Sequence, residues 1–207
     1  MPSAAAKHTR EYFGIRTLLA AHPDMRRLKR ATHATHLHGN KLWGSAYLLI
    51  DYLQENPLDT ASKVLDLGCG WGLASIYCAK YLGAQVSALD ADPAVFPYLS
   101  LLAAHNDVEI NTLCAQFNEL SIDELAQYDT IIASDICFWD EMSEEVFDLI
   151  HRAVEAGVKK IIIADPHRPP FLAVAEACID DFFAELMPRE VITSRHYRGS
   201  LLLIENA

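Results

Sequence analysis

The sequence predicts an α/β fold in which a mostly parallel sheet carries helices on both faces. From Lys63 onward, short apolar or β-branched runs alternate with stretches of helical periodicity, which is the pattern of strands joined by crossover helices. The run at 64–67 ends in three closely spaced glycines, as expected where a buried strand turns sharply into a helix. Two extended runs near the C-terminus, separated by a turn-like segment, predict a closing hairpin.

The first 40 residues differ in character from the rest. Helical patterns cover 10–21 and 24–32, and basic side chains gather in the second stretch. Such a run is usually a solvated helix face, and a docking surface for an acidic partner is the alternative. The basic residues are Arg26, Arg27, Lys29 and Arg30. We therefore expect an N-terminal helical extension, residues 1–40, followed by the main domain, residues 41–207.

Strands and helices are expected to alternate through the main domain. Short apolar runs predict strands at 63–67, 85–89, 108–113, 129–134 and 159–164. Helical patterns follow at 71–82, 93–105, 142–156 and 170–186. Asp92 and Pro93 suit the cap and first turn of the second of these helices. The closing hairpin is expected at 190–196 and 201–205, with its turn at 197–200.

Composition limits the class of protein. A chain of 207 residues with 51% hydrophobic content is long enough for one domain with a substantial core. A formal net charge of −11 disfavours a nucleic-acid partner and suits a cationic substrate, although a purely solubilising role fits equally well. Five cysteines without a C-x-x-C pair argue against disulfides and zinc. We found no export signal or bilayer-spanning run, so we expect a cytoplasmic protein without a membrane partner.

The glycine-rich bend predicts a ligand site. Without Cβ atoms, Gly68, Gly70 and Gly72 adopt otherwise strained dihedrals and let backbone N–H groups approach a ligand. Asp90 ends the next predicted strand, where a carboxylate takes both hydroxyls of a ribose. The two stretches together predict a site for a nucleotide-type cofactor.

This motif resembles motif I of the class I S-adenosylmethionine-dependent methyltransferases. The glycines fall as G-x-G-x-G with Asp66 two residues ahead, whereas a dinucleotide site places its third glycine one position later. The resemblance spans roughly residues 41–205. It implies a Rossmann-like, doubly wound, seven-stranded mixed sheet whose last strand is antiparallel. It also implies S-adenosylmethionine as cofactor, with Asp66 at its amino-acid part and Asp90 at its ribose.

Segments after other strands supply further cofactor-binding candidates, because ligands of open α/β sheets collect at the carboxyl ends of the strands. The resemblance implies that Gln116 pairs with the adenine amino group and that Phe117 packs on the ring, a core role for Phe117 being the alternative. Trp43 precedes an apolar helix, where relatives place a tryptophan against the bound cofactor; a packing anchor is the alternative. Ser134, at the end of the fourth strand, completes the set.

Asp135 and Phe138 are the expected catalytic residues. A carboxylate beside the aromatic pair Phe138 and Trp139 at a strand end suggests a substrate pocket, because an unpaired buried aspartate is costly. The D-x-x-F pattern resembles the family 16 group of methyltransferases, which contains many protein lysine methyltransferases. We expect Asp135 to orient the ammonium group of a lysine. The aromatic rings are expected to lower the pKa of that lysine by desolvation.

Asp165 and Arg168 are candidates for the rim of the same pocket, an ordinary proline-bounded turn being the alternative for each residue. They lie in D-P-H-R, which is similar to the DPxR segment of relatives that methylate the electron-transfer flavoprotein β subunit, with His167 where glycine is common.

The predicted function is methyl transfer from S-adenosylmethionine to the side-chain amine of a lysine in a protein. Small-molecule N- or O-methylation is the alternative among enzymes, because the fold does not choose the acceptor. A regulatory module that binds the cofactor without catalysis is the alternative from another class. No metal is expected: no carboxylate or cysteine at ligand spacing accompanies the histidines His33, His36 and His38, although His36 or His38 could accept a proton over the site.

Overall fold

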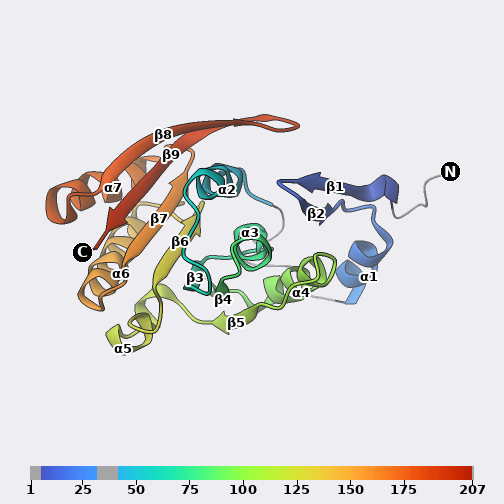
Figure 1. Cartoon of the computed structure of the whole chain (residues 1–207), viewed down its shortest axis with the longest axis horizontal. Helices are drawn as coiled ribbons and strands as arrows, with labels where there is room; N and C mark the ends of the chain where they lie inside the picture. The colour runs from blue at the N-terminus through green and yellow to red at the C-terminus, as the bar shows by residue number, and fades with distance from the viewer. Residues whose placement is uncertain (1–5, 32–41, 207) are drawn as a thin grey trace.

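The computed structural model describes residues 6–31 and 42–206, which are built around one large mixed sheet (Figure 1). Its strands are β3 (Lys63–Leu67), β4 (Gln85–Asp90), β5 (Asn111–Cys114), β6 (Thr130–Ser134), β7 (Lys160–Asp165), β8 (Glu185–Ile192) and β9 (His196–Glu205). The strand order is β5-β4-β3-β6-β7-β9-β8, and β9 is antiparallel to both of its neighbours while the other pairs are parallel. The predicted seven-stranded sheet with an antiparallel last strand is therefore confirmed.

Helices cover both faces of the sheet (Figure 1). One face carries α2 (Ser45–Glu55), α3 (Leu73–Tyr81) and α4 (Phe96–Ala104), and the other carries α5 (Ile122–Leu125), α6 (Glu141–Glu155) and α7 (Pro169–Phe182). Short 3-10 turns lie at η2 (Pro93–Val95) and η3 (Phe117–Glu119). Asp92 caps the first of these turns by accepting from the Ala94 amide at 3.0 Å, as its position before Pro93 predicts.

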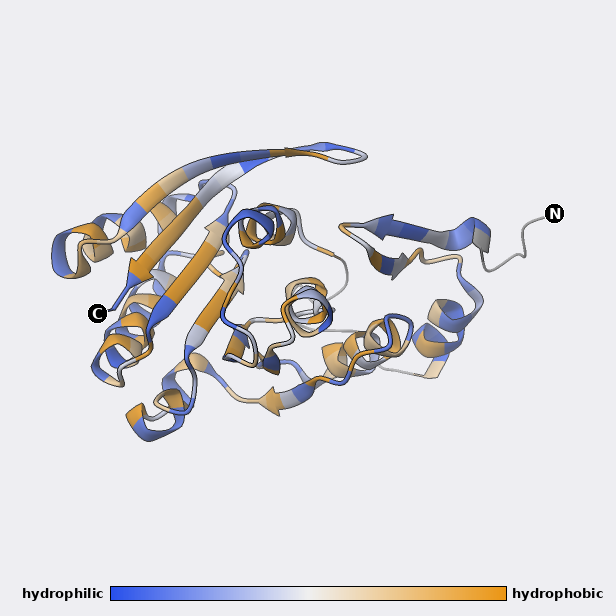
Figure 2. Cartoon of the chain, in the orientation of Figure 1, coloured by the Kyte–Doolittle hydropathy of each residue, from blue (hydrophilic) through white to orange (hydrophobic). Residues whose placement is uncertain are grey.

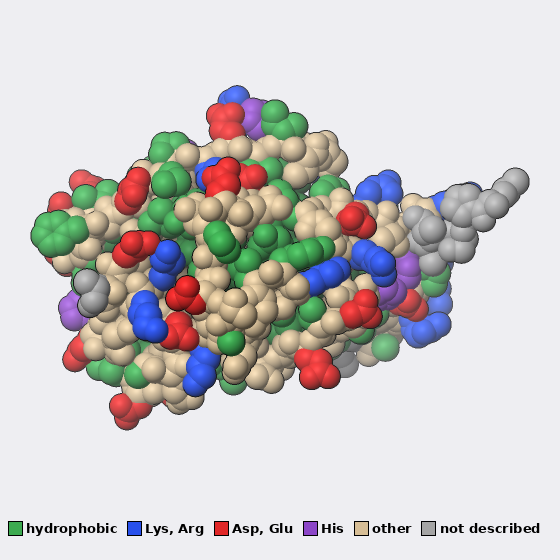
Figure 3. All heavy atoms as spheres, in the orientation of Figure 1, with side chains coloured by type: hydrophobic (Ala, Val, Ile, Leu, Met, Phe, Trp, Pro, Cys, Tyr) green, Lys and Arg blue, Asp and Glu red, His purple; other side chains and the backbone are tan. Residues whose placement is uncertain are grey.

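Alternating side chains divide the interior between the two faces. In β7, Ile162 joins the cluster under α2 and α3, whereas Ile161 and Ile163 join the cluster under α6 and α7. Figure 2 shows the central strands coloured hydrophobic along most of their length, as expected for strands buried on both faces. Acidic side chains are spread over the face shown in Figure 3 instead of gathering in one patch. None of the helices in the two described ranges has the length and apolarity needed to cross a bilayer.

The N-terminal region differs in part from the prediction. The helix expected at 24–32 is confirmed as α1 (Pro23–Ala31), but 10–21 forms a hairpin of β1 (Thr9–Tyr12) and β2 (Ile15–Leu18) after a 3-10 turn, η1 (Ala6–His8). Phe13 and Gly14 have φ of 52° and 73°, which reverses the chain between the strands. A Cβ on Gly14 would overlap the hydroxyl of Tyr81, so a side chain there would displace this half-exposed ring of α3.

The C-terminal hairpin is confirmed, but its turn is not where the sequence predicts it. The connection lies at 193–195, and the segment 197–200 is part of β9. Gly199 is a glycine for another reason: a Cβ there would overlap the Asp165 carbonyl oxygen and approach Leu48 Cδ1 to 2.8 Å. This residue therefore permits close packing of β9 against β7 and α2.

We predict that Gly199→Ala lowers the free energy of unfolding by about 3 kcal/mol, because the backbone of β7 cannot move away from the added methyl group. Urea unfolding measures this loss. Arg198→Ala, on the neighbouring exposed side chain, is the control and should change stability by less than about 0.5 kcal/mol. Equal stability of the two variants would show that the close approach at Gly199 is not a constraint.

Candidate active site

A cavity of about 530 Å³ lies at the carboxyl ends of β3, β4 and β6. All of the residues predicted to bind the cofactor line it, and so do Asp135 and Phe138. The predicted cofactor-binding residues that line the cavity are Trp43, Asp66, Gly68, Gly70, Gly72, Asp90, Gln116, Phe117 and Ser134. The carboxyl ends of parallel strands meet at one edge of the sheet, which explains why residues so far apart in sequence converge here.

The three glycines of the bend serve two different purposes. Gly68, Gly70 and Gly72 have φ of 62°, 51° and 74°, a region that other residues adopt only with strain. A Cβ on Gly68 would lie 2.8 Å from Ile136, and a Cβ on Gly72 would lie 2.7 Å from Leu99. Packing therefore excludes a side chain at both positions. A Cβ on Gly70 would meet nothing within 4 Å. Gly70, which lines the cavity, therefore leaves open space beside the bend.

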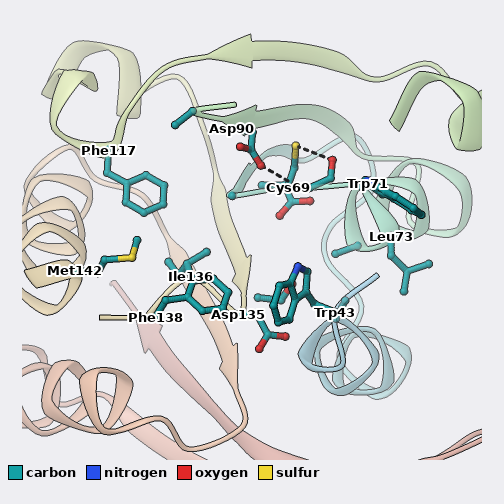
Figure 4. A pocket seen from close by; sticks show the side chains of 18 of the residues that line it. Trp43, Cys69, Trp71, Leu73, Asp90, Phe117, Asp135, Ile136, Phe138 and Met142 are labelled. Atoms are coloured by element: carbon teal, nitrogen blue, oxygen red, sulfur yellow. Dashed lines mark hydrogen bonds between the residues drawn. The ribbon is translucent and has the colours of Figure 1, made fainter. Parts of the chain in front are cut away.

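Asp90 is fixed at the edge of this bend by backbone amides (Figure 4). Gly70 N donates to Asp90 Oδ2 at 3.0 Å, and Asp92 N donates to Asp90 Oδ1 at 2.9 Å. Burial raises the pKa of Asp90, an effect that these two hydrogen bonds oppose. Each carboxylate oxygen keeps a further acceptor site, so the group can still bind hydroxyls in the pocket.

Asp66 is a buried carboxylate beneath the bend. It is 2% exposed, and its Oδ2 accepts a short hydrogen bond from Ser75 Oγ on α3. Burial raises its pKa to about 7, and the nearby Asp90 charge acts in the same direction. A cationic group bound at this end of the pocket would favour the charged form of Asp66.

Aromatic rings form the opposite wall, which we call the aromatic wall: Trp43, Phe138 and Trp139. The Trp43 and Phe138 ring centroids are 5.1 Å apart, and those of Phe138 and Trp139 are 5.8 Å apart. Figure 4 shows Trp43 and Phe138 side by side. Two exposed carboxylates from α6, Glu141 and Glu145, also line the cavity. Aromatic faces and carboxylates together suit a cationic ligand.

Asp135 is arranged differently from the expectation of a carboxylate that is open to an incoming ammonium group. Its Oδ2 accepts from Ser45 N at 2.9 Å, and its Oδ1 lies 2.7 Å from Arg168 Nη2. Its φ of 59° places it in the left-handed region. In Figure 4 its carboxylate points away from the centre of the pocket. Asp135 thus already has two partners within the protein.

Asp165 and Arg168 are not among the residues that line the cavity, so the prediction that they rim it is wrong. The Arg168 guanidinium carbon lies 4.5 Å from the Phe138 ring centroid and 5.9 Å from that of Trp43, which places it behind the aromatic wall. Burial raises the pKa of Asp165 to about 6, although its bonds to Arg168 act in the opposite direction.

Sequence reasoning missed several residues of the pocket. Trp71, in the glycine bend, stacks on Tyr98 with ring centroids 4.9 Å apart. Met142 lines the cavity with Glu141 and Glu145 because α6 begins directly after the aromatic segment. That helix start is the signal that could have found them. The cluster His33, His36 and His38 lies outside the described residues.

Since the pKa of Asp66 is raised, the folded state binds its proton more tightly than the unfolded state does. The contribution of Asp66 to stability is complete below about pH 4 and is lost as the pH rises through about 7. We predict that over this range the free energy of unfolding falls by a few kcal/mol more for the wild type than for Asp66→Asn. Denaturant titrations across this range test it. Asp180→Asn, at an exposed site on α7, should follow the wild type. Parallel curves for the wild type and Asp66→Asn would contradict the prediction.

Comparisons with known proteins agree with this geometry. Residues 64–157 match the family model described as a methyltransferase domain. The electron transfer flavoprotein beta subunit lysine methyltransferase of Xenopus laevis is 30% identical over 132 residues, which are 62% of this chain and 52% of that protein. The ubiquinone biosynthesis O-methyltransferase of Xanthomonas oryzae pv. oryzae is 29% identical over 154 residues, which are 72% of this chain and 60% of that protein. The chain thus spans about half to three fifths of the length of these relatives.

A solved structure shares the fold. The tRNA (uracil-54, C5)-methyltransferase of Pyrococcus abyssi, in complex with S-adenosyl-L-homocysteine, aligns with a TM-score of 0.62 and 18% identity. The alignment covers 95% of this chain and 43% of that protein. Residues 64–157 therefore match a methyltransferase domain, and the chain that contains them shares the α/β fold of this solved methyltransferase.

Proposed function

We propose that this protein transfers a methyl group from S-adenosylmethionine to the side-chain amine of a lysine in a protein. The observation that carries the proposal is that one cavity joins two surfaces of different chemistry. The glycine bend and Asp90 suit a nucleoside, and the aromatic wall with Glu141 and Glu145 suits a cation.

The residues of the pocket fit S-adenosylmethionine. Open space beside Gly70 leaves room for close approach of a ligand to the bend, and the Asp90 carboxylate is oriented to accept from ribose hydroxyls. Asp66 would stabilise the ammonium of the amino-acid part, while Gln116 and Phe117 would hold the adenine. When bound, the cofactor supplies a methyl group that a sulfonium has already activated.

The chain itself must orient the acceptor and remove water and a proton from it. Holding two reactants in line contributes up to about 7 to 11 kcal/mol. A lysine of pKa about 10.4 is almost entirely charged at neutral pH, so Glu141 and Glu145 attract it in this form. Desolvation against the aromatic wall then favours the neutral amine, so the ammonium group releases its proton to water before the amine attacks the methyl group.

The names of the two relatives point to different acceptors, a protein lysine and a ubiquinone precursor. The pocket favours the first. A carboxylate rim beside aromatic faces attracts an ammonium group but offers a neutral phenol no matching charge. Small-molecule methylation is therefore the second outcome of the transfer experiment below.

Gly70→Ala is predicted to weaken S-adenosylhomocysteine binding about tenfold or more, because its Cβ enters the space kept for the ligand. Isothermal titration calorimetry measures the dissociation constant. Gly157→Ala is a matched control: Gly157 also has a positive φ, 81°, and a Cβ there also meets nothing within 4 Å, but it lies outside the pocket. Both variants should lose about 1 to 2 kcal/mol of stability. Equal affinities would exclude the bend from cofactor binding.

The direct test is transfer of tritium from methyl-labelled S-adenosylmethionine to a cell lysate and to purified electron transfer flavoprotein β subunit. We expect acid-stable label recovered as methyl-lysine in the protein fraction. Trp139→Ala should reduce this transfer about tenfold by removing part of the cation site, with S-adenosylhomocysteine affinity kept within about twofold. Phe183→Ala, at a more exposed aromatic residue beyond α7, should leave transfer unchanged. Label found only in small molecules would contradict a protein acceptor and indicate small-molecule methylation. Cofactor binding without any transfer would favour a regulatory module.

A further inference from the structure

Three charged side chains form a cluster behind the aromatic wall. Arg168 Nη1 lies 2.6 Å from Asp165 Oδ2, and Arg168 Nη2 lies 2.7 Å from Asp135 Oδ1. The side chains of Asp135 and Asp165 are 3% and 1% exposed, and that of Arg168 is 21% exposed. Two carboxylates and one guanidinium leave this cluster with one net negative charge. We call it the Arg168 cluster.

The geometry of the Arg168 cluster is fixed from several sides. The Arg168 backbone N–H donates to Asp165 Oδ1 at 2.7 Å, so the loop and its side chain are anchored on one carboxylate. His167, at φ 69°, places its Nε2 2.6 Å from Ser200 Oγ on β9. Asp135 accepts from Ser45 N in the first turn of α2, so its carboxylate is held from a second element.

The cluster lies next to the part of the pocket where a cation is expected. The guanidinium carbon of Arg168 is 4.5 Å from the Phe138 ring centroid, and Phe138 lines the cavity whereas Arg168 does not. The planar guanidinium of Arg168 pairs with the two carboxylates and lies over the Phe138 ring, so it restrains both carboxylates and the ring. A buried charge acts through several ångströms of protein, because screening there is weaker than in water.

We propose that Arg168 is a positioning residue that holds the Asp135 carboxylate and the Phe138 ring, and that the net negative charge of its cluster makes the pocket prefer a cationic group over a neutral one. The inference rests on the proposed function, since the cations concerned are the sulfonium of the donor and the ammonium of the acceptor. It assigns part of the charge preference of the reaction to two side chains that do not line the cavity, Asp165 and Arg168.

The charge is tested with two ligands that differ by one methyl group and one positive charge, S-adenosylmethionine and S-adenosylhomocysteine. Calorimetry at about pH 8 gives the ratio of their dissociation constants, which measures the preference for the sulfonium. Asp165→Asn keeps an acceptor for the Arg168 amide but brings the cluster to zero net charge. The preference for the sulfonium should fall about three- to tenfold. Glu176→Gln, an exposed change on α7, should leave the ratio unchanged.

The double variant Asp165→Asn with Arg168→Met separates charge from structure. In this variant Asp135 is the only charged residue left in the cluster, so the net charge is again −1 although the ion pairs with Arg168 are gone. The ratio of the two dissociation constants should therefore return to within about twofold of the wild-type ratio. Arg168→Lys keeps the positive charge but lacks the planar guanidinium that pairs with two carboxylates at once. It should keep the ratio of the dissociation constants and lower the rate of methyl transfer. An unchanged ratio in Asp165→Asn, or a double variant worse than the single one, would overturn the proposal. Wild-type protein that binds neither ligand would instead reject the proposed function, and this inference with it.

Discussion

The hydrogen bond from the Gly70 amide to the Asp90 carboxylate is the interaction on which the pocket depends. It joins the bend after β3 to the end of β4, and a second bond from Cys69 N to Leu89 O, 2.9 Å long, runs beside it. The bend can make these bonds only because its glycines accept left-handed dihedrals. The same contact orients Asp90, and open space lies beside Gly70, so one local constraint brings together both halves of the proposed nucleoside site.

Much of the fold could be predicted because its signals are local. Runs such as 159–164 are apolar on both faces, which is typical of buried parallel strands, and the observed β7 is shifted by one residue. The predictions were wrong where contacts between distant parts of the chain determine the local structure. Gly199 signals a turn in the sequence, yet it is required by the Asp165 carbonyl of a neighbouring strand. The helical pattern at 10–21 is interrupted by a chain reversal at Phe13 and Gly14, which packs against Tyr81.

The candidate site shows the same division. Most of the pocket residues could be predicted because each ends or follows a strand, and parallel strands end at one edge of the sheet. Trp43, which precedes α2, was predicted from the family resemblance instead. Pairing between loops could not be predicted: nothing in the sequence places Arg168 within 2.7 Å of Asp135, 33 residues away along the chain by 168 − 135. An aspartate that looked available for substrate is therefore bonded to Arg168 and to the start of α2, and the exposed carboxylates near the aromatic wall come from α6.

The central claim is that the glycine bend and Asp90 seat a nucleoside whose reactive end faces the aromatic wall. A crystal structure of the protein with S-adenosylhomocysteine tests it most directly. We predict that the ribose hydroxyls bond to the Asp90 carboxylate and that the sulfur faces Trp43 and Phe138. A ligand bound elsewhere, or a sulfur facing away from that wall, would contradict the account.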